Sequence, residues 1–312
     1  MIADVAVIVP TLRRPDSLER ALRSLFAQAR VADRVCEIVV ADNDPEGSAR
    51  ERVEALRAHS PWPLVYIHVP TPGVATARNA ALAATDAALI AFLDDDEAAA
   101  PDWLARLLAA HEASGADVTF SPIHGRAEGA PAWLKPYLER FFGREGPAKS
   151  GLIDHAYGCG ASLMKRATAL PGAAPFDVSA DQSGGEDDAL FAALAARGGR
   201  FGWAADAWVE EFAPPHRATL RYALTRAFAY GQGPSQTAAK ERNWPALARW
   251  MMVGAAQAAV FGAAALAMTL IGHSRRAFWM DRAVRGLGKV AWMPGLEPRF
   301  YGASELRRLN RA

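Results

Sequence analysis

The sequence predicts an α/β fold, with a mostly parallel central sheet covered by helices on both faces and a helical C-terminal region after it. Over the first hundred residues, short apolar runs alternate with helical patterns, and polar residues follow each apolar run. The C-terminal part contains a long uncharged segment. With 312 residues, 51% hydrophobic and 22% charged, the chain can bury a core in one large domain or in one domain with an appendage.

The elements are expected in strict alternation. Strands are predicted at residues 5–9, 37–41, 64–69 and 87–93, and helices at 17–29, 49–59 and 74–84. This order and spacing imply right-handed crossovers and therefore a parallel sheet. Because ligands of such sheets bind at the carboxyl ends of the strands, the residues that follow each strand are candidate site residues.

Polar residues follow three of these strands. Pro10 and Thr11 come after the first, Asp42 and Asn43 after the second, and the loop after the third leads to Arg78. Asp42 is expected to accept hydrogen bonds from a nucleotide base, with Asn43 or the next aspartate holding base or ribose. The alternative for Asp42 is an Asx-type turn. Arg78 is expected to reach a phosphate, or else to be a solvated helix charge.

The fourth strand ends in four consecutive acidic residues, 94–97. Unscreened like charges at a strand end repel one another unless a cation lies among them, and hard oxygen ligands suit Mg²⁺ or Mn²⁺. Asp94 and Asp96, one residue apart, are expected to share one ion, whose coordination a nucleotide diphosphate would complete. The alternative is a solvated acidic turn before the next helix.

Several classes of protein are disfavoured. A net charge of +1 provides no general basic field, and no basic stretch interleaved with aromatic residues is present, so nucleic acid is not an expected partner. The two cysteines, Cys36 and Cys159, have no metal-site spacing and form no disulfide framework, which fits a reducing cytoplasm. Met1 leads directly into the first apolar run, so we expect a core strand there rather than a signal peptide.

Five motifs together resemble family 2 glycosyltransferases, which have the GT-A fold, a Rossmann-like sheet. The motifs are Val7-Ile8-Val9-Pro10-Thr11, Ile38-Val39-Val40-Ala41-Asp42-Asn43-Asp44, Gly73-x-x-x-Ala77-Arg78-Asn79, Phe92-Leu93-Asp94-Asp95-Asp96 and Gly184-Gly185-Glu186-Asp187. The resemblance covers roughly residues 4–230. It implies transfer of a sugar from a nucleotide-sugar donor, most often a UDP-sugar, with inversion at the anomeric carbon.

The resemblance also implies roles for single residues. Asp42 and Asn43 would meet the base, Arg78 the nucleotide side, and Asp95 the ribose or diphosphate. Asp94 and Asp96 would hold Mn²⁺ or Mg²⁺, with Asp96 the direct ligand. Pro10 and Thr11 would complete the nucleotide-sugar site. The catalytic domain would span residues 1–230, with a nucleotide-binding half at 1–100 and an acceptor-binding half at 101–230.

The remaining roles concern the acceptor. Asp187 would be the base that takes the proton of the acceptor hydroxyl, and Glu186 would orient it or bind acceptor. The alternative is that these acidic residues only stabilise a helix N-terminus. Trp133 is expected to stack on an acceptor sugar, or else to pack under its loop. Processive relatives carry a Gln-x-x-Arg-Trp element, and because no such string follows Asp187, a single addition is expected.

The C-terminal region, residues 231–312, is expected to be helical and membrane-associated. Residues 251–272 are 22 residues without a charge, close to the ~20 that cross a bilayer. Three interpretations stay open: a hairpin that lies on or re-enters the membrane, a true span, and a buried core helix. Nearby basic residues suit anionic lipid. We therefore expect a bacterial protein at the cytoplasmic face of the inner (plasma) membrane.

The expected partners are a nucleotide-sugar donor, a lipid-linked or saccharide acceptor and a membrane surface. Two other functional classes stay open from the residues alone. A nucleotidyltransferase would also use a metal and carboxylates on an α/β sheet, although no matching basic activating loop is seen. A catalytically silent membrane scaffold that only binds nucleotide is the non-enzymatic alternative.

Overall fold

The computed structural model describes residues 4–182, 184–298 and 300. Residues 1–3 and 183 of the predicted catalytic domain, and residues 299 and 301–312 of the predicted C-terminal region, lie outside this description. The chain forms two compact units. The sheet unit comprises 4–124, 143–212 and Phe300, and the helical unit comprises 125–142 and 213–298.

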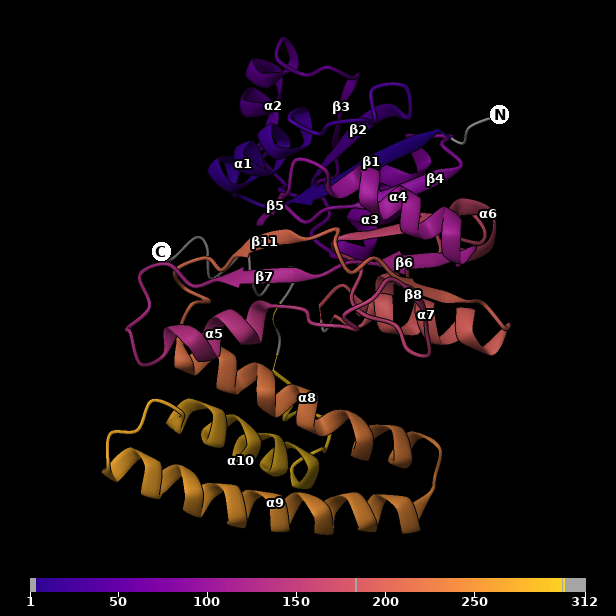
Figure 1. Cartoon of the computed structure of the whole chain (residues 1–312). Helices are drawn as coiled ribbons and strands as arrows, with labels where there is room; N and C mark the ends of the chain where they lie inside the picture. The colour runs from indigo at the N-terminus through magenta and orange to yellow at the C-terminus, as the bar shows by residue number, and fades with distance from the viewer. Residues whose placement is uncertain (1–3, 183, 299, 301–312) are drawn as a thin grey trace. The chain divides into compact units, whose positions relative to one another are not determined.

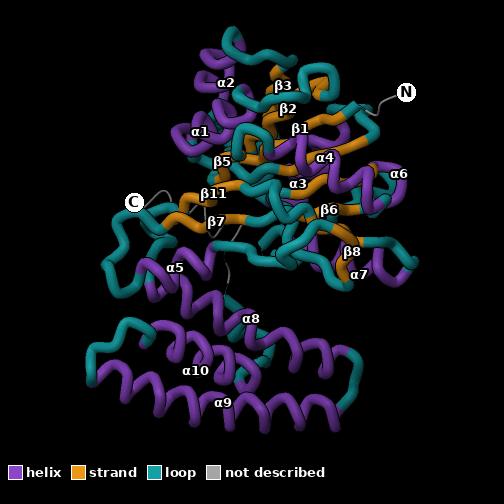
Figure 2. Tube along the Cα trace, in the orientation of Figure 1, coloured by secondary structure: helices purple, strands orange, loops and turns teal. Residues whose placement is uncertain are grey.

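The sheet unit is built on one eight-stranded sheet (Figures 1 and 2). Its strand order is β3-β2-β1-β4-β9-β6-β10-β8. The strands are β1 Val5–Thr11, β2 Val35–Asp42, β3 Leu64–His68, β4 Leu89–Phe92, β6 Val118–Phe120, β8 Gly151–Ile153, β9 Ser162–Lys165 and β10 Phe201–Trp203. Strands β1 to β4 are parallel, β9 runs antiparallel to both β4 and β6, and β8 is antiparallel to β10. The sheet is therefore mostly parallel, as predicted.

Helices cover both faces of this sheet, because successive residues of β1 point to opposite sides. Val7 and Val9 pack in one apolar cluster with α1 and α4, whereas Ala6 and Ile8 pack in a second cluster with α3 and α7. The helices of this unit are α1 Pro15–Phe26, α2 Arg50–Arg57, α3 Val74–Ala83, α4 Trp103–Ser114, α6 Arg166–Ala169 and α7 Glu186–Ala196, with a 3₁₀ turn, η1, at Val178–Ala180. The predicted two-faced α/β architecture is confirmed.

A small second sheet includes Glu97, the last residue of the acidic run. Its strand order is β5-β11-β7, with β5 Glu97–Ala99, β11 Val209–Phe212 and β7 Ile123–Arg126. β5 pairs antiparallel with β11, and Glu97 lies opposite Glu211 in this pairing. The chain passes from the sheet unit to the helical unit within β7. This sheet anchors the segment that directly follows Asp96.

The predicted elements of the first hundred residues all occur, with shifted ends. The first helix ends at Phe26 rather than near residue 29. Ala27 is the C-cap, with a ψ of 4° that departs from helical geometry, and Arg30, three residues further on, has a φ of 62° in the left-handed region. The fourth strand is shorter than predicted and ends at Phe92.

The helical unit holds α5 Lys135–Phe142, α8 Leu220–Lys240, α9 Trp244–Leu270 and α10 Arg276–Val290. The predicted domain boundary at residue 230 falls inside α8, whereas the two compact units separate at residue 213 and place 125–142 with the helices. The physical reason is that α8 is one continuous helix, which packs with α10 and α9. Among the described residues, α9 is the helix long and apolar enough to cross a membrane.

Candidate active site

The carboxyl ends of β1 and β4 meet because these strands pair in parallel. Pro10 and Thr11 are the last two residues of β1, and the Thr11 hydroxyl donates to Asp95 Oδ2 at 2.7 Å. In the loop that follows, Arg14 Nη1 donates to Asp95 Oδ1 at 3.0 Å and to Asp96 Oδ2 at 2.9 Å. Burial raises the pKa of Asp95 to about 6, although the Arg14 guanidinium and the Thr11 hydroxyl oppose this. Arg14 thus offsets part of the repulsion between two neighbouring carboxylates.

The acidic run is not a solvated turn. Asp95, Asp96 and Glu97 are buried, whereas the Asp94 side chain is 38% exposed. Glu97 Oε2 accepts the N–H groups of Asp94 at 2.9 Å and Ala161 at 3.2 Å. Burial, followed by the nearby Asp94 and Glu211 carboxylates, raises the pKa of Glu97 well above its usual range. Asp94 is therefore the open carboxylate of the run, and Glu97 fixes the backbone beneath it.

At the end of β2, the expected base-binding residues are engaged by the protein itself. Asp42 is fully buried, its Oδ1 accepts the N–H of Asp44, and its Oδ2 accepts from the Ala49 N–H and the Tyr66 hydroxyl. The bond to Asp44 is the Asx-type turn that the sequence left open as an alternative. Burial and the bond to Asp42 raise the pKa of Tyr66 to about 12.

Asn43 connects the second strand end to the third. Its Nδ2 donates to the carbonyls of Val69 at 3.0 Å and Thr71 at 2.7 Å, and its Oδ1 accepts the Gly73 N–H at 2.6 Å. The Asn43 N–H donates in turn to the Thr11 carbonyl. Asp42 and Asn43 therefore shape the sheet edge, and a role for either in base recognition stays a prediction.

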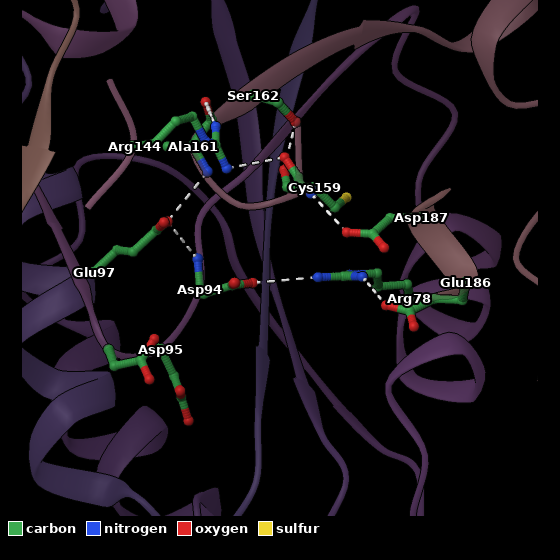
Figure 3. A network of polar contacts seen from close by, with 12 residues as sticks. Arg78, Asp94, Asp95, Glu97, Arg144, Cys159, Ala161, Ser162, Glu186 and Asp187 are labelled. Atoms are coloured by element: carbon green, nitrogen blue, oxygen red, sulfur yellow. Dashed lines mark hydrogen bonds and ion pairs between the residues drawn. The ribbon is translucent and has the colours of Figure 1, made fainter. Parts of the chain in front are cut away.

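Arg78 lies in the second turn of α3 and is buried rather than solvated. Its Nη1 donates to Glu186 Oε1 at 2.6 Å, and its Nη2 lies 3.5 Å from Asp94 Oδ1 (Figure 3). Burial alone would lower the pKa of Arg78, but the side chains of Cys159, Asp94 and Glu186 hold it above its usual value. Arg78 thus connects the acidic run at the end of β4 to the first residue of α7.

Asp187 is the second residue of α7, and the chain enters this helix through Gly184 and Gly185, whose φ angles of 80° and 91° favour glycine. Its Oδ2 accepts the Cys159 N–H at 3.1 Å (Figure 3). Its Oδ1 accepts the N–H of the following residue. Its side chain is half-buried, beside the buried Glu186. The structure thus brings Asp187, Glu186, Arg78 and Asp94 together.

The segment between β8 and β9, residues 154–161, forms a wall segment between Asp94 and Asp187. A Cβ on Gly160 would stand 2.7 Å from Asp94 Oδ2, and one on Gly158 would stand 3.4 Å from Asp187 Oδ2. The Arg144 guanidinium contacts this segment, since its Nη2 donates to the Gly158 carbonyl at 3.0 Å. Burial lowers the pKa of Arg144, which the Glu97 carboxylate partly offsets.

Trp133 lies in the helical unit, and the Arg276 guanidinium stacks 3.7 Å from the centre of its ring. It also packs against the apolar cluster of that unit. This is the packing role left open as an alternative. Contact of Trp133 with an acceptor stays a prediction.

Carboxylates outnumber guanidiniums in this network. The network described above links six carboxylates to three guanidiniums. The carboxylates are those of Asp94, Asp95, Asp96, Glu97, Glu186 and Asp187, and the guanidiniums are those of Arg14, Arg78 and Arg144. This excess of carboxylates over guanidiniums favours a cation with oxygen ligands. Within the part of the chain that is described, no group of three or more His, Cys, Asp or Glu side chains is arranged to hold a metal ion. Asp94 and Asp96 would therefore need further oxygen ligands from a bound molecule.

Sequence reasoning missed Arg14 and Arg144, and it gave Glu97 no role of its own within the acidic run. Arg14 carried a detectable signal, since it follows the first predicted strand in the same way as the predicted polar residues. Arg144 lies in a loop without a recognisable pattern, and only the fold brings it to the carbonyls of Ser121, Gly158 and Ala161.

The sequence model of the family described as Glycosyl transferase family 2 matches residues 6–169 of this chain. The chain is 35% identical over 301 residues to the succinoglycan biosynthesis protein ExoM of Rhizobium meliloti (strain 1021), which covers 96% of each chain.

Two solved structures share the fold. The mannosyltransferase PcManGT from Pyrobaculum calidifontis, in complex with GDP-Man and Mn²⁺, superposes with a TM-score of 0.62 at 18% identity and covers 94% of this chain and 88% of that one. TarS 1-349 of S. aureus, in complex with UDP-GlcNAc, has a TM-score of 0.54 at 16% identity and covers 95% and 99%. With the family match, these likenesses identify the fold as GT-A and the chain as an enzyme of glycosyl transferase family 2.

Proposed function

We propose that the enzyme transfers a sugar from a nucleotide-sugar donor, with a UDP-sugar the first candidate, to an acceptor hydroxyl, with inversion at the anomeric carbon. The donor class is supported by the relatives that were solved with GDP-Man or UDP-GlcNAc. The observation that carries the proposal is the position of Arg78. Its guanidinium contacts Asp94 at the donor-side strand end and Glu186 beside the candidate base.

In the proposed reaction, the acceptor oxygen attacks the anomeric carbon as its proton passes to the Asp187 carboxylate. A bond forms between that oxygen and the anomeric carbon, the bond from this carbon to the diphosphate oxygen breaks, and the nucleoside diphosphate leaves. The N–H groups of Cys159 and Asp188 orient the Asp187 carboxylate. Glu186, fixed by Arg78, would keep α7 in place and contact the acceptor.

Asp94 and Asp96 are the residues that would hold Mn²⁺ or Mg²⁺. A divalent cation bound there would supply positive charge for the departing diphosphate. Arg78 would add a fixed positive charge at the same strand end. Asp95, held by Thr11 and Arg14, would face the ribose or the diphosphate.

For the acceptor, we propose a lipid-linked or saccharide precursor of an envelope or exopolysaccharide, at the cytoplasmic face of a bacterial inner membrane. Support comes from the similarity to ExoM, a bacterial succinoglycan biosynthesis protein, and from the apolar helix α9. We further propose a single addition per binding event, since the Gln-x-x-Arg-Trp element of processive relatives is missing from the sequence. Trp133 would contribute a stacking surface to the acceptor.

The test is Asp187→Asn, with Asp188→Asn as the matched neighbouring control. Donor binding is measured by calorimetry, and turnover by release of nucleoside diphosphate in the presence of membrane lipid extract. The proposal predicts that Asp187→Asn binds donor but does not turn over, whereas Asp188→Asn does both. Full turnover by Asp187→Asn would show that Asp187 is not the catalytic base. Release of pyrophosphate instead would indicate a nucleotidyltransferase, and donor binding without turnover by the wild type would indicate a scaffold.

A further inference from the structure

The inner face of α9 is fixed to its neighbour α10. Gly254 of α9 and Gly286 of α10 meet so closely that a Cβ on Gly254 would stand 2.6 Å from the Gly286 carbonyl oxygen. At the midpoint of α9, Gln257 Oε1 accepts from Lys289 Nζ at 3.1 Å. Phe261 stacks on Trp279 with 5.6 Å between ring centres. The two helices therefore pack as a pair, and α10 also contacts α8 on its other side (Figure 1).

The outer face of α9 is apolar and exposed. Met252, Val260, Leu266 and Leu270 are 68%, 64%, 63% and 78% exposed, and at 3.6 residues per turn they fall within about 120° of the helix circumference. Most of the exposed positions between them are alanines, and Val253 and Thr269 are exposed as well. Soluble monomers rarely leave so continuous an apolar stripe in water, so this outer face of α9 is expected to have a partner.

The charged residues around α9 indicate the chemistry of that partner. From Arg242 to Met280 the sequence contains no Asp or Glu, and its only Lys or Arg residues are four arginines. Arg242 and Arg249 lie at the start of α9, and Arg275 and Arg276 follow its end. Trp244, 62% exposed, stands at the first position of the helix. Arginines and tryptophan around an apolar stripe suit the interface of an anionic bilayer.

We infer that α9 lies in the plane of an anionic membrane surface, with its outer face among the acyl chains and both of its ends on the same side of the bilayer. This inference concerns binding only and does not depend on the proposed reaction. It decides among the three possibilities for residues 251–272 in favour of the membrane-lying form.

The packing of α10 argues against a span. If α9 crossed the bilayer, its midpoint at Gln257 would lie at the centre of the hydrocarbon, and the Lys289 ammonium would lie there with it. α10 also carries Asp281, Arg282 and Arg285 within its 15 residues. Charged side chains at that depth are costly, so a span would break the α9–α10 pair. Arginines at both ends fit the headgroup region of one leaflet.

The first test measures binding to vesicles. The full-length wild type should co-sediment with vesicles that contain phosphatidylglycerol and bind at least tenfold more weakly to phosphatidylcholine alone. The double variant Val260→Glu with Leu266→Glu should lose about tenfold or more of its binding, since each Glu places a charge among acyl chains. Leu152→Glu, an equally exposed apolar position on β8, should bind as the wild type does. Equal binding by the double variant, with circular dichroism showing that it is folded, would overturn the inference.

The second test distinguishes an α9 that lies on the membrane surface from one that spans the bilayer. With Cys36→Ser and Cys159→Ser as background, Glu241→Cys and Ser274→Cys place one thiol before α9 and one after it. A membrane-impermeant maleimide should label both thiols in inverted membrane vesicles and neither in intact spheroplasts. Labelling of one thiol in each preparation would show a span. A dimer by sedimentation, without vesicle binding, would show instead that a second copy covers the outer face.

Discussion

Gly160 lies so close to two candidate carboxylates that no side chain fits there. A Cβ at this position would stand 2.7 Å from Asp94 Oδ2 and 2.8 Å from Glu97 Oε1. Gly160→Ala must therefore displace one of these groups. Since a shift of about 1 Å in an active site can lower turnover by roughly 100-fold, we expect kcat to fall by about ten- to a hundred-fold.

The measurement is kcat with saturating donor and acceptor. Gly233→Ala is the control, because nothing lies within 4 Å of the added Cβ in α8. An unchanged kcat in Gly160→Ala would show that the wall segment does not shape the site.

His111 provides a prediction about pH. It is buried on α4, its Nδ1 lies 2.8 Å from Thr119 Oγ1, and burial lowers its pKa to about 4. In the unfolded chain the pKa is about 6.5, so below that pH the unfolded state takes up a proton first. The free energy of unfolding should fall by on the order of 3 kcal/mol between about pH 6.5 and pH 4, with no contribution from His111 above that range.

Urea denaturation of the wild type and of His111→Gln, compared at each pH, isolates this contribution from that of the carboxylates. The difference between the two proteins should change across this pH range. A difference that stays constant would mean that His111 is not held neutral.

How far single residues could be predicted depends on where their partners lie. The acidic run, Arg78 and Asp187 carry local signals, and the structure brings them together. Asp42 illustrates the limit, because its carboxylate accepts from Tyr66 and Ala49, contacts that only the folded loop creates. Arg144 has no local signal at all, since its contacts are made by the fold of a loop.

At the scale of elements, Asp181 joins α3 to the segment that leads into α7. Its Oδ1 accepts the N–H groups of Ala75 at 2.8 Å and Thr76 at 3.2 Å, and its Oδ2 accepts the Thr76 hydroxyl at 2.6 Å. This carboxylate satisfies the first N–H groups of the helix that carries Arg78. Removing it frees both the helix N-terminus and the segment before Asp187.

We predict that Asp181→Ala lowers the free energy of unfolding by about 1–2 kcal/mol and lowers kcat more than it raises the KM for donor. Asp177→Ala is the matched control, because Asp177 is exposed and caps only its own 3₁₀ turn. Chemical denaturation and steady-state kinetics measure both effects. Identical behaviour of the two variants would contradict a role for Asp181 in positioning α7.

Strands β1 to β4 could be predicted because each is a short apolar run followed by polar residues. β9 could not be, since it pairs antiparallel with β4 and β6, and only the assembled sheet supplies these neighbours. The predicted domain boundary at residue 230 falls inside α8 because it was placed where the family resemblance ends. The packing of α8 with α9 and α10 instead assigns the whole helix to the helical unit.

For the whole molecule, the proposed donor site and the proposed membrane-binding face belong to different units. Thr11, Arg78 and Asp94 lie in the sheet unit, and the outer face of α9 lies in the helical unit. The Val260→Glu and Leu266→Glu double variant should therefore bind nucleotide as the wild type does, because the substituted residues belong to a different compact unit from the candidate nucleotide-binding residues. It should transfer sugar to a lipid-linked acceptor in vesicles about tenfold more slowly.

Calorimetry and a vesicle transfer assay measure the two properties separately. Transfer to a soluble acceptor analogue serves as the control and should be unchanged. Loss of nucleotide binding in the double variant would show that the two units are coupled.

We propose that the end of β4 holds a nucleotide diphosphate together with a divalent cation. Calorimetric titration of the wild type with UDP, GDP and dTDP, each with and without Mn²⁺, tests it most directly, with Asp96→Ala as the variant and the exposed Asp86→Ala as the control. We expect binding of one nucleotide that requires Mn²⁺, is lost in Asp96→Ala and is retained in Asp86→Ala. Equal binding without the metal, or unchanged binding by Asp96→Ala, would contradict it.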